Sequence, residues 1–293
     1  MTAKMKRILI TGATGNIGSQ VIRFLYNTDT ENILIAGVRD MDKARQKFKN
    51  YPSLAFTEFD FDKPDTFNGA LEKIDSIFLL RPPHISDIDK YFKPLINKIK
   101  EKGIREVMFL SVQGVEKSGV IPHNKIEKLI KEHQLNYIFL RPSYFMQNLT
   151  TTLIDDIRTK RKIILPAGNA KFNWVDIENI GEIASRLLNE FDNYKNQAIE
   201  ITGYENKNFH EVTSLINECV ANKIEYISPN PFRYYNIKKH DGLARGMIFV
   251  MIMLHCLPRF QKEPKISDFY EKLTGKKPTS LKDFVKREYM ILS

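Results

Sequence analysis

The sequence predicts an α/β protein, with a Rossmann-type, doubly wound parallel sheet and a small, mostly helical C-terminal lobe. Two observations predict this class. Short apolar β-rich runs alternate with amphipathic helical stretches through the first two thirds of the 293 residues, which is the pattern of consecutive β-α-β units. A glycine-rich turn also separates the first β-run from the first helical stretch. We expect a nucleotide-binding domain over residues 1–205 and a dependent lobe over residues 206–293 that packs on it.

The individual elements follow from local composition. Continuous apolar runs such as ILI and IFLL in this sequence are typical of strands covered on both faces. In the lobe, Phe209–Val220 is expected to be a helix and Ile224–Ile227 a short strand, with mainly helices thereafter. The expected strands of the large domain are Arg7–Thr11, Ile33–Val38, Leu54–Glu58, Ser76–Leu80, Glu106–Ser111, Tyr137–Arg141 and Ala198–Thr202, and the helical stretches are Ile17–Tyr26, Lys43–Phe48, Ile88–Glu101 and Lys125–His133.

Composition excludes several classes of protein. Two cysteines exclude a disulfide framework and a zinc site made of several thiolates, and we expect no metal. The net charge is +10, and 13 basic against 6 acidic residues lie between Arg233 and Ser293. These cations occur singly or in adjacent pairs and no nucleic-acid motif accompanies them, so we interpret them as solvated helix faces and expect no nucleic-acid partner. The start of the chain lacks the pattern of a secretion signal, which predicts a cytoplasmic protein.

One apolar run in the lobe has three open interpretations. Met247–Leu257 is too short for a membrane span, so no span is predicted. It is expected to be a buried helix, with the wall of a pocket or an interfacial patch as the alternatives.

The glycine-rich turn predicts a dinucleotide site. The first glycine allows a sharp turn off the strand, the second a close approach to a pyrophosphate, and the third close packing of the helix on the sheet. The amides and positive end of that helix then face the anion. The cofactor contacts expected here are Thr11, Gly12, Thr14, Gly15, Asn16, Ile17 and Gly18.

The end of the second strand predicts which nicotinamide cofactor binds. Arg39 stands near the position where an NAD site usually has an acid, and Lys43 follows one helical turn later. A guanidinium binds a 2′-phosphate that an acid would repel. NADP(H) is therefore predicted, with NAD(H) as the weaker alternative if Asp40 turns inward to the ribose.

Two later strand ends are expected to border the same nucleotide. Asp60 and Phe61 would contact the adenine, through its amino group and its face respectively. Leu80, Arg81 and Pro82 end the fourth strand at the crevice where such sheets bind ligands.

Together these segments resemble the NmrA-like branch of the atypical short-chain dehydrogenase/reductases. The resemblance covers nearly the whole chain and rests on TGATGNIG, VRDMDKA, FLLRPP, FLSVQGV, PHNKIEKLI, LRPSYFMQNL, FNWVDIENIGEIA and LTGKKPTSLKDFV. It implies a Rossmann-type fold, and either an NADPH-dependent reductase of quinones, azo dyes or triphenylmethane dyes, or a regulator that senses the nucleotide.

The usual catalytic tyrosine of short-chain enzymes is absent from its expected helix. Ser111 lies where their serine would be, but the next helix begins Pro122-His123-Asn124-Lys125. The resemblance implies that His123 contacts the nicotinamide ribose and that Glu127 shares its helix face; a cap or surface role for His123 stays open. Two Tyr-to-Lys pairs in the tail, Tyr234/Lys238 and Tyr235/Lys239, are interpreted as coincidence.

Aromatic residues after the sixth strand are expected to border the nicotinamide. Pro142, Tyr144 and Phe145 would line a slot in which Asn148 orients a ligand, although packing of the next helix is an equal reading. Phe172 and Trp174 are further candidates for this slot. Ser111, His123 and Tyr144 remain the candidate catalytic residues.

The missing acid predicts the reaction class. A hydride donor held against a flat, electron-poor acceptor needs little acid catalysis, because the cofactor carries the difficult step and water supplies protons. We expect an NADPH-dependent oxidoreductase acting on a small conjugated molecule without a Tyr/Lys pair. The alternative is a non-catalytic NADP(H) sensor with a regulatory protein partner; a homo-oligomer is also possible. Sugar-nucleotide epimerase chemistry is disfavoured by the absent pair.

Overall fold

The computed structural model describes residues 5–28 and 31–293, and it divides into two compact units. The first unit runs to Pro142 and also contains Ile177–Ile201, and the second contains Ser143–Asp176 and Thr202–Ser293. This division differs from the single boundary expected at residue 205, because Ser143–Asp176 belongs to the second unit. Residues 1–4, part of the stretch from which we expected no secretion signal, lie outside the described residues.

The first unit is built on a seven-stranded parallel sheet, as expected. Its strand order is β10-β6-β5-β4-β1-β2-β3, and every neighbouring pair is parallel. The strands are β1 (Arg7–Ile10), β2 (Ile33–Val38), β3 (Ala55–Glu58), β4 (Ser76–Leu80), β5 (Glu106–Leu110), β6 (Asn136–Pro142) and β10 (Gln197–Ile201). The order reverses between β1 and β4, which is the switch point where such sheets bind ligands.

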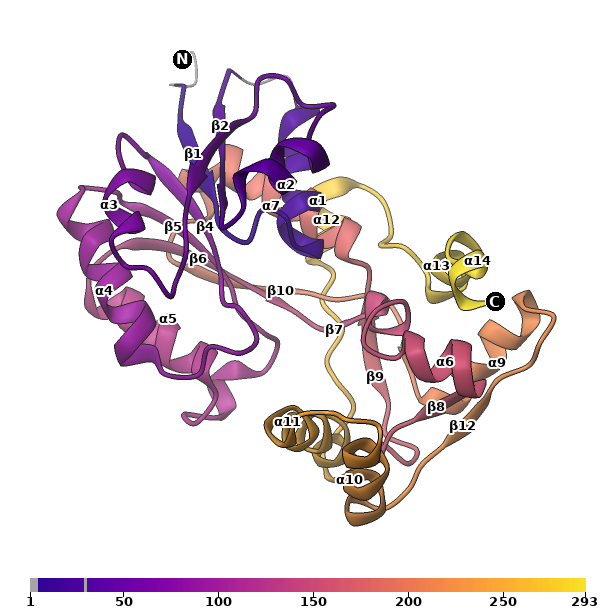
Figure 1. Cartoon of the computed structure of the whole chain (residues 1–293). Helices are drawn as coiled ribbons and strands as arrows, with labels where there is room; N and C mark the ends of the chain where they lie inside the picture. The colour runs from indigo at the N-terminus through magenta and orange to yellow at the C-terminus, as the bar shows by residue number, and fades with distance from the viewer. Residues whose placement is uncertain (1–4, 29–30) are drawn as a thin grey trace. The chain divides into compact units, whose positions relative to one another are not determined.

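Helices cover this sheet on both faces. On one face α3 (Thr66–Ala70), α4 (Ile88–Glu101) and α5 (Pro122–Glu132) lie together (Figure 1) and bury a core with alternate residues of the strands. Elsewhere α1 (Asn16–Tyr26) packs against α7 (Ile177–Asn189), where a Cβ on Gly181 would lie 2.7 Å from Gln20 Cβ. The remaining helices of the unit are α2 (Met41–Lys47), α8 (Phe191–Tyr194) and a 3-10 turn, η1 (Val115–Lys117).

The second unit combines two small sheets with short helices. One sheet has the order β11-β9-β7, and the other pairs β8 with β12 in parallel. Its strands are β7 (Tyr144–Phe145), β8 (Lys162–Ile164), β9 (Phe172–Val175), β11 (Asn206–Lys207) and β12 (Glu225–Ile227). Its helices are α6 (Ile154–Lys160), α9 (Phe209–Cys219), α10 (Pro231–His240), α11 (Arg245–Cys256), α12 (Phe269–Thr274), α13 (Leu281–Arg287) and α14 (Tyr289–Leu292), with 3-10 turns η2 (Met146–Leu149) and η3 (Leu257–Phe260).

The apolar run in the tail forms a helix, but it is not a buried one. Helix α11 buries only Ile248, Met251 and His255, and most of its other side chains are exposed. The expected buried helix is therefore wrong for most of its surface. Among the residues that the structure describes, no helix is both long enough and apolar enough to cross a membrane.

Candidate functional site

The glycine-rich turn has the geometry that a dinucleotide site requires. Gly12 adopts a φ of +59°, a left-handed conformation that favours glycine. A Cβ on Gly15 would lie 3.1 Å from the Gly12 carbonyl oxygen, and a Cβ on Gly18 would lie only 2.3 Å from it. Gly18 is therefore required for the close passage of α1 over the turn, and larger residues are excluded there.

The amino end of α1 is left open to an anion. Its N-cap is Gly15, which offers no side-chain cap, and the first turn contains no acidic residue. Thr14, Gly15 and Asn16 are exposed, while Ile17 is buried beneath them. The first amides of a helix have no partner within it and lie at the positive end of its dipole. This arrangement fits a pyrophosphate.

Thr11 contributes to the site through the sheet. Its buried hydroxyl donates to the Phe78 carbonyl oxygen at 3.0 Å and accepts from the Leu80 amide at 2.9 Å. The hydroxyl thus joins the ends of β1 and β4 at the switch point. Leu80 lies under the turn, because its Cδ2 would be 3.2 Å from a Cβ on Gly12.

Arg39 and Lys43, the two cations predicted to meet the cofactor, follow β2. Arg39 is exposed, and no carboxylate lies within salt-bridge distance of it in the described parts of the chain. Asp40 caps α2 by accepting from the Lys43 amide at 3.0 Å and also pairs with the Lys43 ammonium at 3.3 Å. The pKa of Asp40 is lowered, chiefly by that amide bond. Asp40 is therefore engaged on α2, and Arg39 remains available to a phosphate.

Lys47 is a contact that the sequence analysis missed. Its ammonium donates to the Thr14 carbonyl oxygen at 2.6 Å and so places a positive charge on the turn itself. The available signal was helical spacing, since Lys47 lies one turn beyond Lys43 on the same short helix.

The two residues expected to meet the adenine have other partners. Phe61 is buried, with ring centroids 5.2 Å from Phe59 and 5.0 Å from Phe92. Its ring faces are therefore used inside the apolar core. The Asp60 carboxylate accepts from the Asp62 amide at 3.0 Å and remains half-buried at the end of β3.

Arg81 and His123 meet at the end of β4. Arg81 folds back onto its own loop, where Nη1 donates to the carbonyl oxygens of Pro82 and Pro83 at 3.1 Å each and to that of Ile85. Its Nε donates to His123 Nε2 at 3.3 Å. Burial and the neighbouring guanidinium lower the pKa of His123 to about 3. His123 is therefore neutral near pH 7 and, on this geometry, carries its proton on Nδ1.

A buried charged cluster occupies the region where short-chain enzymes place their serine and tyrosine. Ser111 donates to Glu127 Oε1 at 2.6 Å, and Arg141 binds both oxygens of the same carboxylate, at 3.0 and 2.7 Å. Arg141 also donates to Glu116 at 3.0 Å. Burial opposes the charge of Arg141, but the bond to Glu127 and the charges of Glu127, Glu116 and Glu200 raise its pKa overall. The Ser111 proton is thus committed to Glu127, so Ser111 does not stand as a free donor.

The second unit holds a neutral polar pair. The Tyr144 hydroxyl lies 3.0 Å from His255 Nε2, and His255 Nδ1 lies 2.7 Å from the Met251 carbonyl oxygen. Because a carbonyl only accepts, Nδ1 carries the proton and Tyr144 donates to Nε2. Burial lowers the pKa of His255 to about 4 and raises that of Tyr144, against a hydrogen bond with Asn148 that lowers the latter. No signal within the apolar run pointed to His255 as the partner.

Aromatic rings surround this pair. The Tyr144 ring centroid lies 4.9 Å from that of Trp174 and 5.2 Å from that of Phe172, both of which are buried. Trp174 also donates its indole N–H to the Lys207 carbonyl oxygen at 3.0 Å. Phe172 and Trp174 are therefore core residues of the second unit rather than pocket walls. Phe145 is half-buried and pairs with Val175 in the small sheet.

Pro142 and the Tyr234/Lys238 pair are the two remaining predictions of this site. Pro142 is buried at the end of β6, where its carbonyl oxygen accepts from the Gln113 amide at 2.9 Å. Lys238 binds the Asp156 carboxylate and pairs with Asp241 at 3.3 Å. Its ammonium is thus engaged with carboxylates, in keeping with Tyr234/Lys238 being a chance spacing.

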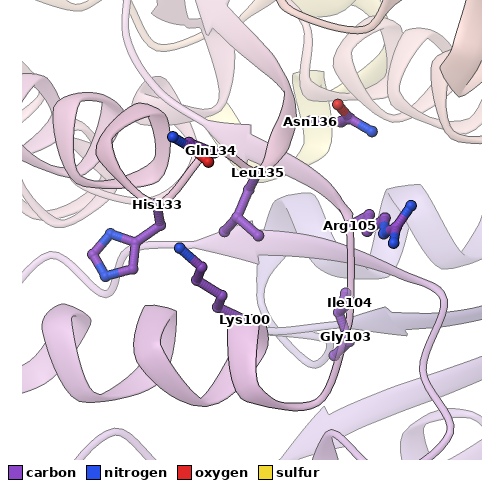
Figure 2. A pocket seen from close by; sticks show the side chains of 8 residues that line it. All are labelled: Lys100, Gly103, Ile104, Arg105, His133, Gln134, Leu135 and Asn136. Carbon is purple, nitrogen blue, oxygen red and sulfur yellow. The ribbon is translucent and has the colours of Figure 1, made fainter.

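A surface hollow of the first unit lies at the end of the sheet where the strands begin. Figure 2 shows Lys100 and His133 on one side of it and Arg105 on the other. It adjoins the amino-terminal starts of β5 and β6, whereas the glycine-rich turn follows the carboxyl end of β1. In a parallel sheet the starts and the ends of the strands lie at opposite ends of the sheet, so this hollow is separate from the candidate nucleotide site.

Comparison with known proteins agrees with this architecture. The chain is 29% identical over 289 residues to Prestalk A differentiation protein A of Dictyostelium discoideum, covering 99% of this chain and 94% of the relative. It is 25% identical over 288 residues to the NAD(P)H azoreductase of Xenophilus azovorans, covering 95% and 96%. The solved structure of Citrobacter sp. triphenylmethane reductase complexed with NADP(H) matches with a TM-score of 0.84 at 20% identity, covering 96% and 99%.

The family itself follows from a match along most of the sequence. The model of the NmrA-like family matches residues 4–255. That range contains the glycine-rich turn, the basic residues after β2 and the buried Ser111–Glu127–Arg141 cluster. The chain belongs to the NmrA-like family.

Proposed function

We propose that this protein is an NADPH-dependent oxidoreductase that reduces a small, flat, conjugated acceptor of the quinone, azo or dye type. The observation that carries the proposal is the open amino end of α1 behind a turn that only glycine permits at Gly12 and Gly18. An NAD(P)H azoreductase and a triphenylmethane reductase among the similar proteins support it.

The chain's own residues would hold the nucleotide by its phosphates. The amides of Asn16 and Ile17 in the first turn of α1 face the diphosphate, since the Gly15 amide already donates to the Gly12 carbonyl oxygen at 2.9 Å. Arg39 meets the 2′-phosphate with a charge-assisted bond. Lys47 stiffens the turn through Thr14 and adds positive charge beside it. Since Asp40 is engaged on α2, the inward-turned acid of an NAD site has no candidate there. We therefore propose NADP(H) rather than NAD(H).

The proposed acceptor follows from what the residues near the switch point can donate. The Ser111 hydroxyl donates to Glu127, His123 is neutral, and no tyrosine stands on α5. When bound, NADPH would supply a hydride. An acceptor that stabilises the added electron pair by conjugation needs no strong acid at that step, which suits this set of side chains.

The first test is turnover. Purified protein mixed with NADPH and a panel of quinones, azo dyes and triphenylmethane dyes should oxidise NADPH. The oxidation is measured as the loss of the near-ultraviolet absorbance of NADPH. NADP(H) binding by calorimetry with no turnover across the panel would contradict the enzymatic proposal and favour the sensor. No binding of any pyridine nucleotide would overturn both.

The second test concerns cofactor choice. Arg39→Glu replaces attraction at the 2′-phosphate by repulsion, so NADPH affinity should fall by at least about tenfold, while NADH affinity changes little. Arg105→Glu is the matched control, because it makes the same charge change at the opposite end of the sheet and should leave both affinities unchanged. Equal losses for the two nucleotides in Arg39→Glu would contradict the assignment of Arg39.

A further inference from the structure

Helix α11 of the second unit is apolar all round but is covered on one side only. The buried residues, Ile248, Met251 and His255, are spaced by three and four and mark the side that packs on its own unit. A helix that is apolar over its whole circumference is normally enclosed. The side of α11 opposite these residues therefore needs a second explanation.

That opposite side forms a continuous exposed apolar surface, which we call the α11 face. Its residues recur at helical spacing and continue into η3: Met247, Val250, Met253, Leu254, Leu257 and Phe260. Met253 is 56% exposed and Phe260 80% exposed. Single exposed apolar residues are ordinary, but a run of adjacent ones marks an interaction site.

The charged residues within the segment that carries the α11 face are all positive. Residues 242–262 contain no aspartate or glutamate. Arg245, Arg259 and Lys262 are exposed, and none has a carboxylate within salt-bridge distance in residues 5–28 and 31–293. The surface thus combines exposed Leu, Met, Val and Phe side chains with unneutralised cations.

We propose that the α11 face docks on an anionic lipid surface. An interfacial helix places apolar side chains at the acyl boundary while bordering Lys and Arg attract anionic headgroups. The 12 residues of α11 are too few to span a bilayer, so the contact is peripheral. The inference does not depend on the reductase activity.

Charge favours lipid over a second copy of this chain. A two-fold interface centred on α11 would apply the same patch to itself. The cations of the α11 face in one copy would then be brought toward those of the other, and residues 242–262 supply no acid between them. An anionic bilayer instead complements all three.

The test measures co-sedimentation of the full chain with vesicles. Vesicles of phosphatidylcholine alone are compared with vesicles that contain about 30% phosphatidylglycerol. We expect at least about tenfold stronger binding to the anionic vesicles. Binding should weaken when NaCl rises from about 0.1 M to about 0.5 M, because the Debye length shortens from about 10 Å to about 4 Å.

Variants assign the binding to the α11 face. Met253→Glu/Leu254→Glu should lose at least about tenfold in vesicle binding, and Arg245→Gln/Lys262→Gln should lose most of the preference for anionic vesicles. Met290→Glu is the matched control: Met290 is 72% exposed on α14 of the same unit, and the variant should bind as wild type. Tryptophan fluorescence of Trp174 checks that each variant is folded.

Two outcomes would overturn the proposal: no binding of the wild type to anionic vesicles, or equal vesicle binding by the wild type and Met253→Glu/Leu254→Glu. If the wild type binds no vesicles but forms a dimer that Met253→Glu/Leu254→Glu dissociates, the α11 face is assigned to a second copy. Vesicle binding without NADPH binding would refute the proposed function alone, so the two failures are distinguishable.

Discussion

Two polar clusters, one in each unit, are stabilised by opposite means. In the first unit, Ser111, Glu127 and Arg141 form a charged cluster whose members neutralise one another. In the second, the half-buried Tyr144 and the buried His255 form a neutral pair, and burial holds the histidine in its uncharged form. A charged cluster is costly when one member is removed, whereas a neutral pair is costly when protons are added.

The largest expected effect comes from removing Arg141. Arg141→Ala leaves the Glu127 carboxylate buried without its cation, and we expect the free energy of unfolding to fall by about 3–5 kcal/mol. Urea unfolding followed by far-ultraviolet circular dichroism measures it. The control is Arg23→Ala, which breaks the more exposed pair with Glu178 in the same unit and should cost at most about 1 kcal/mol. Equal costs would remove the distinction between a buried and a surface pair.

Acid tests the neutral pair. Because the pKa of His255 is depressed to about 4, the unfolded chain takes up the proton first as pH falls below about 6.5. The stability that the folded state gains by holding His255 neutral is fully present above about pH 6.5, and it is lost progressively between about pH 6.5 and pH 4. At pH 5, His255 should cost the second unit about 2 kcal/mol relative to pH 7.

Trp174, the single tryptophan, reports this unit by fluorescence. His255→Gln keeps an oxygen acceptor for Tyr144 and should remove the loss of about 2 kcal/mol in the free energy of unfolding between pH 7 and pH 5. His240→Gln, at an exposed position, should leave that loss unchanged. An unchanged pH slope in His255→Gln would show that the buried histidine does not set it.

The smallest effect concerns the hydroxyl of the pair. Tyr144→Phe keeps the ring contacts with Phe172 and Trp174 but leaves His255 Nε2 without its donor, for a loss of about 1 kcal/mol at pH 7. Tyr204→Phe, at an exposed position, should cost almost nothing. In a double-mutant cycle with His255→Gln, additive losses would argue that the two side chains are not coupled.

The first unit was largely predictable because most of its central strands are continuous apolar runs that are buried on both faces. The Ile33–Val38 and Ser76–Leu80 strands begin and end where composition placed them. The second unit was not, because β7 and β11 have two residues each and pair with β9 across about thirty residues of sequence. Periodicity carries no signal for strands this short.

The candidate site divides in the same way. Gly12 and Gly18 were predictable, because the turn chemistry is local. The roles of Arg141 and His255 were not, because each depends on a partner more than ten residues away that only the folded chain brings close. Phe61 was misplaced for a related reason: the sequence indicates an aromatic residue at a strand end but not which way its ring points.

The interleaving of the two units has a consequence for synthesis. When the ribosome has released residues up to Pro142, the sheet still lacks β10, so the edge of β6 is unpaired, and α1 lacks the cover of α7. Both wait for Ile177–Ile201, which emerges only after the first segment of the other unit. A nascent chain at that stage exposes a strand edge and an apolar helix face, the features that recruit chaperones or lead to aggregation. Truncation within this interval should therefore give insoluble fragments rather than a small nucleotide-binding domain.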